Sequence, residues 1–185
     1  MRLLPSFFSL ALLVLTGCPS ADPLAEPPTV QEPSLVVAGW EEAGAMVAAH
    51  QGKVVVLDLW STWCLPCMKE FPHLVEIHKQ FPEDVACMSF NLNYIGAEDE
   101  TPESMRDQVM PFLKSRKAFF ENVISSDPDH VVMEKISLAS IPAVMVFGRD
   151  GELVKRFDND QGLYGEGFTY QDHVVPLVQE LVSAK

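Results

Sequence analysis

The sequence has few positive charges and few cysteines. Of its 185 residues, 13 are Lys or Arg and 26 are Asp or Glu, which gives a formal net charge of −13. This deficit of positive charge argues against nucleic acid or anionic lipid headgroups as partners, because both bind basic patches. The four cysteines cannot staple a scaffold, so the fold must depend on a hydrophobic core.

The motifs of several cofactor sites are also absent. The sequence contains no glycine-rich phosphate loop, and its five histidines form no pair at metal-ligand spacing near the cysteines. Cys67 is followed by Met68 instead of His, which excludes the motif for covalent haem attachment. We therefore predict no cofactor and no metal ion, with metal binding by the cysteines as the alternative.

The chain begins with a segment typical of exported bacterial proteins. Arg2 precedes an apolar stretch from Leu3 to Leu15, which is too short to span a bilayer but fits a secretory signal peptide. The residues Leu15-Thr16-Gly17-Cys18 resemble the bacterial lipobox, whose cysteine is lipidated and becomes the mature N-terminus. Ordinary signal cleavage, with an incidental Cys18, is the alternative.

A proline-rich tract follows. Five prolines between Pro19 and Pro33, with few large apolar residues, predict an extended spacer without a core. We therefore expect a signal peptide at residues 1–17, a lipidated cysteine and linker at residues 18–33, and one folded domain at residues 34–185. The predicted location is the bacterial cell envelope, with the chain anchored in a membrane by lipid and facing the periplasm or the cell exterior.

The folded region is predicted to alternate strands and helices. Apolar runs rich in β-branched residues predict strands, and apolar positions three to four residues apart predict helices. The expected strands are 34–38, 53–60, 84–93, 119–125, 143–147 and 152–157, and the expected helices are 43–50, 65–80, 101–117, 129–138 and 170–183. Pro72, Pro111 and Pro176 are expected to bend or split their helices. Residues 149–151 predict a hairpin, and residues 158–170 an irregular linker or a partner contact.

Two cysteines lie where the strand 53–60 gives way to the helix 65–80. Unpaired N–H groups and the positive dipole end of a helix stabilise a thiolate, so we expect a lowered pKa at Cys64 and assign it as the attacking thiol. Cys67 lies on the first helical turn, close enough to form a disulfide with Cys64 and to resolve a mixed disulfide. Cys87 is expected to be a small buried hydrophobe, with a redox role as the alternative.

The residues around this pair carry a family resemblance. Trp63-Cys64-Leu65-Pro66-Cys67, with the flanking Trp60-Ser61-Thr62 and Lys69-Glu70-Phe71-Pro72, is similar to the thioredoxin superfamily. Within it, the string resembles the extracytoplasmic, membrane-tethered thiol–disulfide oxidoreductases of the TlpA/ResA type. The likeness runs from about Leu35 to the C-terminus. It implies an α/β thioredoxin-like fold with a central mixed β-sheet, helices on both faces, and an extra helix and strand between the cysteine helix and the strand 143–147.

The resemblance also assigns residues to substrate positioning. It implies a cis peptide bond at Ile141-Pro142 beside the disulfide, with the Ile141 backbone available to a substrate strand. A trans proline at a strand start is the alternative. Trp63 is expected to shield the site and to offer an apolar docking surface, and Pro66 is expected to help position the substrate.

Two carboxyl groups are candidates for handling the proton of Cys67 during exchange. Glu70 lies three residues after Cys67, on the same helix face, and matches a glutamate of ResA-like proteins. Asp58 lies on the strand before the cysteines, where thioredoxins carry a buried acid and where burial would raise its pKa. The alternatives are a solvated Glu70 and an exposed Asp58, and the division of labour between the two acids stays open.

The predicted function is exchange of the Cys64–Cys67 dithiol and disulfide with protein substrates. Reduction, for example in cytochrome c maturation, is the favoured direction. An oxidant or isomerase of the same fold is one alternative, and a non-catalytic metal- or protein-binding module is the other. The expected partners are protein thiol or disulfide substrates and an upstream dithiol electron donor, and the expected oligomeric state is a monomer.

Overall fold

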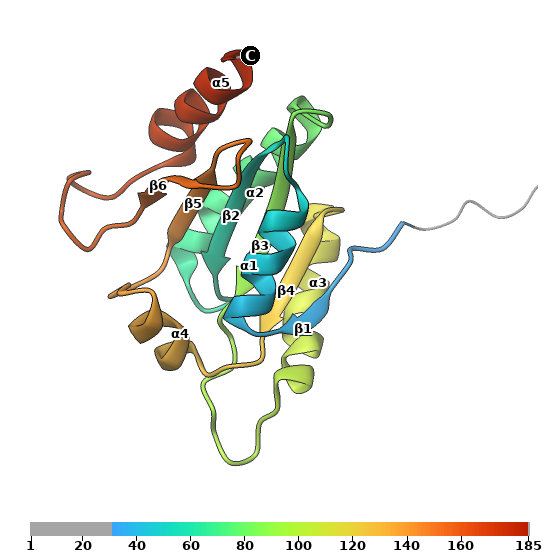
Figure 1. The fold of residues 1–185 in the computed structure, drawn as a ribbon. Helices are drawn as coiled ribbons and strands as arrows, with labels where there is room; N and C mark the ends of the chain where they lie inside the picture. The colour runs from blue at the N-terminus through green and yellow to red at the C-terminus, as the bar shows by residue number, and fades with distance from the viewer. Residues whose placement is uncertain (1–30, 185) are drawn as a thin grey trace, which may run out of the picture. The chain divides into compact units, whose positions relative to one another are not determined.

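Six strands form one mixed sheet in the computed structural model, which describes residues 31–184 (Figure 1). The strands are β1 (Val36–Ala38), β2 (Val54–Trp60), β3 (Val85–Asn91), β4 (Glu121–Ser125), β5 (Ala143–Phe147) and β6 (Leu153–Phe157). Their order is β1-β4-β3-β2-β5-β6, with β5 and β6 antiparallel to their neighbours. The predicted signal peptide, Cys18 and the linker as far as residue 30 lie outside the described residues.

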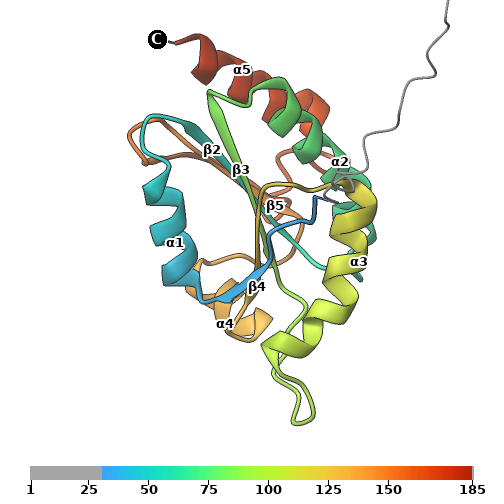
Figure 2. The same cartoon turned by 90° about the vertical axis from the view of Figure 1, so that its right-hand side faces the viewer.

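Helices cover both faces of this sheet. They are α1 (Trp40–Ala49), α2 (Leu65–Gln80), α3 (Arg106–Arg116), α4 (Asp129–Lys135) and α5 (Val175–Ser183), with a short 3-10 turn η1 (Pro102–Met105) and a π-helical turn η2 (Tyr170–Val174). Figure 2 shows α1 and α4 against one face and α2, α3 and α5 against the other. The segment between α2 and β5 contains β3, α3, β4 and α4, so the predicted fold class is confirmed. No helix within residues 31–184 combines the length and apolarity that crossing a bilayer requires.

The central strand β2 is buried along its whole length. Val54, Val56 and Trp60 pack into the core under α2, α3 and α5, whereas the odd-numbered residues of β2 pack under α1 and α4. Successive side chains of a strand point to opposite faces, so Asp58 lies on the same face as Trp60. This parity places the acid under the cysteine helix.

The two prolines inside α2 and α3 do not break these helices. Helix α2 runs unbroken through Pro72, and α3 runs unbroken through Pro111. The expected split of the helix at Pro111 is therefore wrong. Pro111 lies on the exposed side of α3, where a carbonyl that loses its helical partner can bond to water. Pro176 lies in the first turn of α5, where its missing N–H costs little.

The segment between β6 and η2 contains no strand or helix, as predicted. It is nevertheless anchored, because Phe168 is buried and packs near Phe157, with the two ring centroids 6.1 Å apart. The hairpin between β5 and β6 is also confirmed, with the positive φ of Gly151 in its turn. The anchored segment therefore delivers η2 to the α2 face of the sheet.

Candidate active site

The cysteine pair lies at the start of α2. Cys64 is the N-cap residue of this helix, and its Sγ atom accepts a hydrogen bond of 3.2 Å from the Cys67 N–H. Cys64 and Cys67 form a disulfide with a Cα–Cα distance of 5.2 Å. The helix therefore directs at the sulfur an N–H group that has no backbone partner within the helix. This N–H favours negative charge on the sulfur when the disulfide is reduced. The predicted position of both cysteines at the helix start is confirmed.

The two sulfurs differ in accessibility. Cys67 is 1% exposed, whereas Cys64 is partly exposed and lies beside Trp63, which is 53% exposed. Leu65 is also exposed on the first turn of the helix. A partner can therefore approach Cys64 across an apolar surface, while Cys67 lies behind it.

An asparagine clamp, formed by Asn93 and Asn91, holds the turn before Cys64. Asn93 accepts a hydrogen bond of 2.9 Å from the Thr62 N–H through Oδ1 and donates one of 2.8 Å to Thr62 Oγ1 through Nδ2. Asn91 donates to the same Oδ1 at 3.0 Å, and both asparagines are fully buried. The sequence analysis missed this role. Polar residues at alternate positions near the end of a buried strand were the signal that could have revealed it.

Replacing Asn93 by Ala is expected to loosen the turn that carries Trp63. Amide exchange of Thr62 should rise about tenfold relative to the amides of β2, because its N–H loses a buried acceptor. The free energy of unfolding should fall by about 1–3 kcal/mol. Hydrogen exchange followed by NMR measures both quantities.

Asn122→Ala is the matched control for the asparagine clamp. Asn122 is equally buried, but its side-chain NH₂ group donates hydrogen bonds to the backbone carbonyls of Ser34, Ala118 and Phe120, away from the cysteines. This variant should lose similar stability without a selective change at Thr62. A selective rise at Thr62 in Asn122→Ala, or none in Asn93→Ala, would contradict the clamp.

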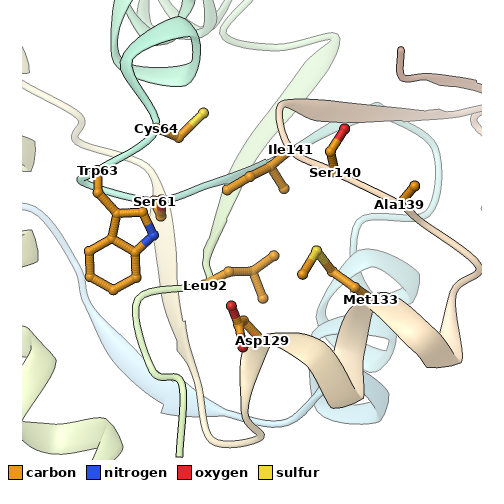
Figure 3. A pocket seen from close by; sticks show the side chains of 9 residues that line it. All are labelled: Ser61, Trp63, Cys64, Leu92, Asp129, Met133, Ala139, Ser140 and Ile141. Carbon is orange, nitrogen blue, oxygen red and sulfur yellow. The ribbon is translucent and has the colours of Figure 1, made fainter. Parts of the chain in front are cut away.

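The Ile141–Pro142 peptide bond is cis, as the resemblance implied. Ile141 lines a cavity of about 260 Å³ beside Cys64, into which Met133 and Asp129 of α4 also project (Figure 3). Trp63 and Ser61 line the opposite side. The cavity therefore joins the cysteine turn, the proline loop and α4 at one end of the sheet.

A second cavity, of about 340 Å³, is also lined by Ile141. Pro66, Glu70 and Pro142 line one part of it, and residues of the segment 158–170, including Glu166 and Phe168, line the rest. Ile141 contributes to both cavities. The residues predicted to position a substrate are thus brought together around one loop.

The two predicted acids lie close together and share a neighbour. Asp58 is 2% exposed, and its Oδ2 accepts a hydrogen bond of 2.5 Å from the hydroxyl of Tyr170. Glu70 is partly buried, and its Oε2 accepts a hydrogen bond of 2.9 Å from the Tyr170 N–H. The alternative of an exposed Asp58 is therefore wrong, because parity turns its side chain under α2.

Burial raises the pKa of Asp58 from its ordinary 3.8 to about 7. Loss of hydration is the largest cause, the hydrogen bond from Tyr170 opposes the rise, and the charge of Glu70 adds to it. Burial also raises the pKa of the free thiol of Cys87, which lies in the core with Sγ 3.6 Å from the Leu74 carbonyl. Asp58 can therefore gain or lose a proton near neutral pH, whereas Cys87 stays a thiol, as predicted for a buried hydrophobe.

The sequence analysis placed Tyr170 only at the boundary between the segment 158–170 and the helix 170–183, and missed its contact with both acids. The signal was the capping pattern of Thr169 and Asp172, in which the Thr169 hydroxyl accepts a hydrogen bond from the Asp172 N–H. Such a cap places the next residue on the helix. Within residues 31–184 no group of three or more His, Cys, Asp or Glu side chains has the arrangement of a metal site.

The site combines a disulfide at a helix N-terminus with a cis proline beside it and a buried acid beneath it. On a mixed sheet, this combination defines a thioredoxin-like redox domain. The chain belongs to the thioredoxin-like family, whose family model matches residues 52–153, more than half of the sequence.

Known relatives include the thiol-disulfide oxidoreductase ResA of Bacillus subtilis, which is 29% identical over 106 residues. That match covers 57% of this chain and 52% of ResA, so the chain spans about half the length of this relative. Among solved structures, a secreted disulfide oxidoreductase of Mycobacterium tuberculosis is similar, with 23% identity and a TM-score of 0.53 over 72% of this chain and 86% of that one. An exposed lipoprotein thioredoxin of Streptococcus pneumoniae has 24% identity and a TM-score of 0.52 over 73% and 90%.

Proposed function

We propose that this protein is a thiol–disulfide oxidoreductase that reduces disulfides of protein substrates outside the cytoplasm. One observation carries the proposal: the accessible Cys64 caps α2 and is joined to the buried Cys67 directly behind it. This pair provides an attacking sulfur and a resolving sulfur without any cofactor. The names of the relatives, which include a thiol-disulfide oxidoreductase, support the same chemistry.

In the proposed reaction, the Cys64 thiolate attacks one sulfur of a substrate disulfide. A mixed disulfide forms, and the other substrate sulfur leaves as a thiolate and takes up a proton. Cys67 then gives its proton to a nearby carboxylate and attacks Cys64. The Cys64–Cys67 disulfide forms, the reduced substrate leaves, and two electrons have moved from the protein to the substrate. An upstream dithiol protein restores the cysteines by the reverse exchange.

The substrate is proposed to bind as an extended segment along Ile141. The two cavities that Ile141 lines can each receive a side chain that flanks the substrate cysteine. Main-chain hydrogen bonds give affinity in such an arrangement, and pockets give specificity. Trp63 and Pro66 would border the two sides of this segment.

Anchoring in the cell envelope is part of the proposal. It depends on the signal-like segment and on Cys18 in the sequence Leu15-Thr16-Gly17-Cys18. The solved relative from Streptococcus pneumoniae, described as an exposed lipoprotein, supports this location. We propose that the protein acts there as a monomer on substrates such as apocytochrome c.

The equilibrium redox potential against glutathione tests the proposed direction. A reductase is expected to have a potential of about −270 mV, because thioredoxin has such a potential and the cysteine pair must lose electrons to its substrate. A value near about −120 mV, typical of a strong oxidant, would contradict a reductase. Metal analysis of the reduced protein tests the rival binding module, which requires bound metal and no turnover of insulin disulfides.

A further inference from the structure

Tyr170 touches both candidate acids with two different atoms. Its hydroxyl donates to Asp58 Oδ2 at 2.5 Å and its backbone N–H donates to Glu70 Oε2 at 2.9 Å. The two acids lie 112 and 100 residues earlier in the chain. Tyr170 is 1% exposed and begins the π-helical turn η2. The C-terminal part of the chain therefore fixes the relative positions of carboxyl groups on β2 and α2.

The two oxygens of Asp58 are not equivalent. Oδ2 accepts the Tyr170 hydroxyl, whereas Oδ1 is buried and has no hydrogen-bond partner within residues 31–184. An unpaired buried carboxylate oxygen is costly, and protonation lowers that cost because it removes the charge. Oδ1 is therefore the atom on which Asp58 would carry a proton, while the bond to Tyr170 stabilises the ionised form.

The surroundings of the Asp58–Tyr170 pair explain why this bond matters. Glu70 of α2 faces the pair and its charge opposes negative charge there, whereas the buried Cys87 of β3 is a neutral thiol. The ring of His73, also on α2, lies 6.3 Å from the ring of Tyr170. On the other side of β2, Asp58 pairs with the apolar Val144 of β5. Among the described residues, the Tyr170 hydroxyl is the one hydrogen-bond donor to the side-chain carboxyl group of Asp58.

We propose that Tyr170 is a positioning residue that holds Glu70 and Asp58 as one acid pair and keeps Asp58 able to accept the proton of Cys67. The proposal rests on the function proposed above. In the resolving step, the Cys67 thiol gives its proton to Asp58 Oδ1, the Cys67 sulfur bonds to Cys64, and the bond between Cys64 and the substrate sulfur breaks. The departing substrate thiolate then takes the proton from Asp58, directly or through solvent, so protons and electrons balance.

Tyr170→Phe tests the proposal, because it removes the hydroxyl but keeps the ring and the backbone N–H. In the oxidised full chain, NMR of carbon-labelled Asp should show the Asp58 midpoint moving up by about one pH unit, since the variant loses a hydrogen bond to a charged group. The pH profile of mixed-disulfide resolution should move in the same direction. At pH 7 resolution should slow by about fivefold, and at pH 9 it should equal the wild-type rate.

Tyr164→Phe is the matched control, because Tyr164 is a nearby tyrosine whose ring packs on Phe157 and His173 and which, within residues 31–184, makes no hydrogen bond to either acid. It should leave both the Asp58 midpoint and the pH profile unchanged. In an Asp58→Asn background, Tyr170→Phe should no longer move the pH profile, because its partner is gone.

Unchanged titration of Asp58 in Tyr170→Phe, or an equal shift in Tyr164→Phe, would overturn the proposal. The titration needs no substrate, so it separates this inference from the proposed function. If Asp58 shifts as expected but the wild-type protein exchanges no disulfides, the proposed function fails and the effect of Tyr170 on Asp58 stands.

Discussion

Cys64→Ser is expected to slow the reduction of insulin disulfides by about a thousandfold or more. A serine hydroxyl is not ionised at neutral pH and cannot form a disulfide, so the attacking step is lost. The fold should tolerate the change, because serine is a favoured N-cap residue and its hydroxyl can accept the Cys67 N–H. The turbidity of reduced insulin with an external dithiol gives the rate, and a thermal melt checks the fold.

A variant at Cys67 separates the attacking step from the resolving step, and a variant at Cys87 serves as the control. Cys67→Ser keeps the attacking sulfur but lacks the resolving one, so a mixed disulfide with the substrate should accumulate and be visible on a non-reducing gel. Cys87→Ala is the control, because this thiol lies in the core away from the exposed turn. It should react at the wild-type rate. Full activity of Cys64→Ser, or loss of activity in Cys87→Ala, would contradict the assigned roles.

Asp58→Asn is expected to make the protein more stable at pH 8 and less active. Below about pH 4 Asp58 is protonated in both the folded and the unfolded chain and does not affect the pH dependence. Between that pH and about 7 the unfolded chain loses the proton while the folded protein keeps it, so stability falls as the pH rises. A rise in pKa from 3.8 to about 7 corresponds to a loss of about 4 kcal/mol above pH 7.

Urea unfolding at pH 4 and pH 8 measures this effect. The variant should gain about 2–4 kcal/mol over the wild type at pH 8 and little at pH 4, because asparagine carries no charge and still accepts the Tyr170 hydroxyl. Glu70→Gln is the control, since a glutamine oxygen can still accept the Tyr170 N–H. A gain at pH 4 as large as at pH 8 would show that charge burial is not the cause.

The activity of Asp58→Asn should fall because the proton of Cys67 loses its acceptor. Removing a general base commonly costs about a hundredfold or more, so resolution of the mixed disulfide should slow by about that factor near pH 7. Single-turnover kinetics separate this step from the first attack, which should change little. If Glu70→Gln lowers resolution more than Asp58→Asn does, Glu70 is the principal acceptor.

Much of the fold was predictable because local patterns coincide with its elements. The apolar run of β2, the helical spacing from Cys67 to Gln80 and the turn at Gly151 each depend on neighbours in sequence. Those patterns also placed Cys64 at the helix start. The split expected at Pro111 did not occur, because the effect of a proline inside a helix depends on whether the carbonyl that loses its partner faces water.

The family and the cysteine pair were thus indicated by sequence alone, through motif spacing, and the resemblance named the two acids as candidates. Tertiary structure decided how these groups meet. It decided which face of the sheet holds Asp58. It also formed the hydrogen bonds of Asn93 to Thr62 and of Tyr170 to Asp58 and Glu70, which join residues that are far apart in the chain. No local pattern encodes such contacts, because they arise only when separate elements pack over one core and their buried polar groups must find partners.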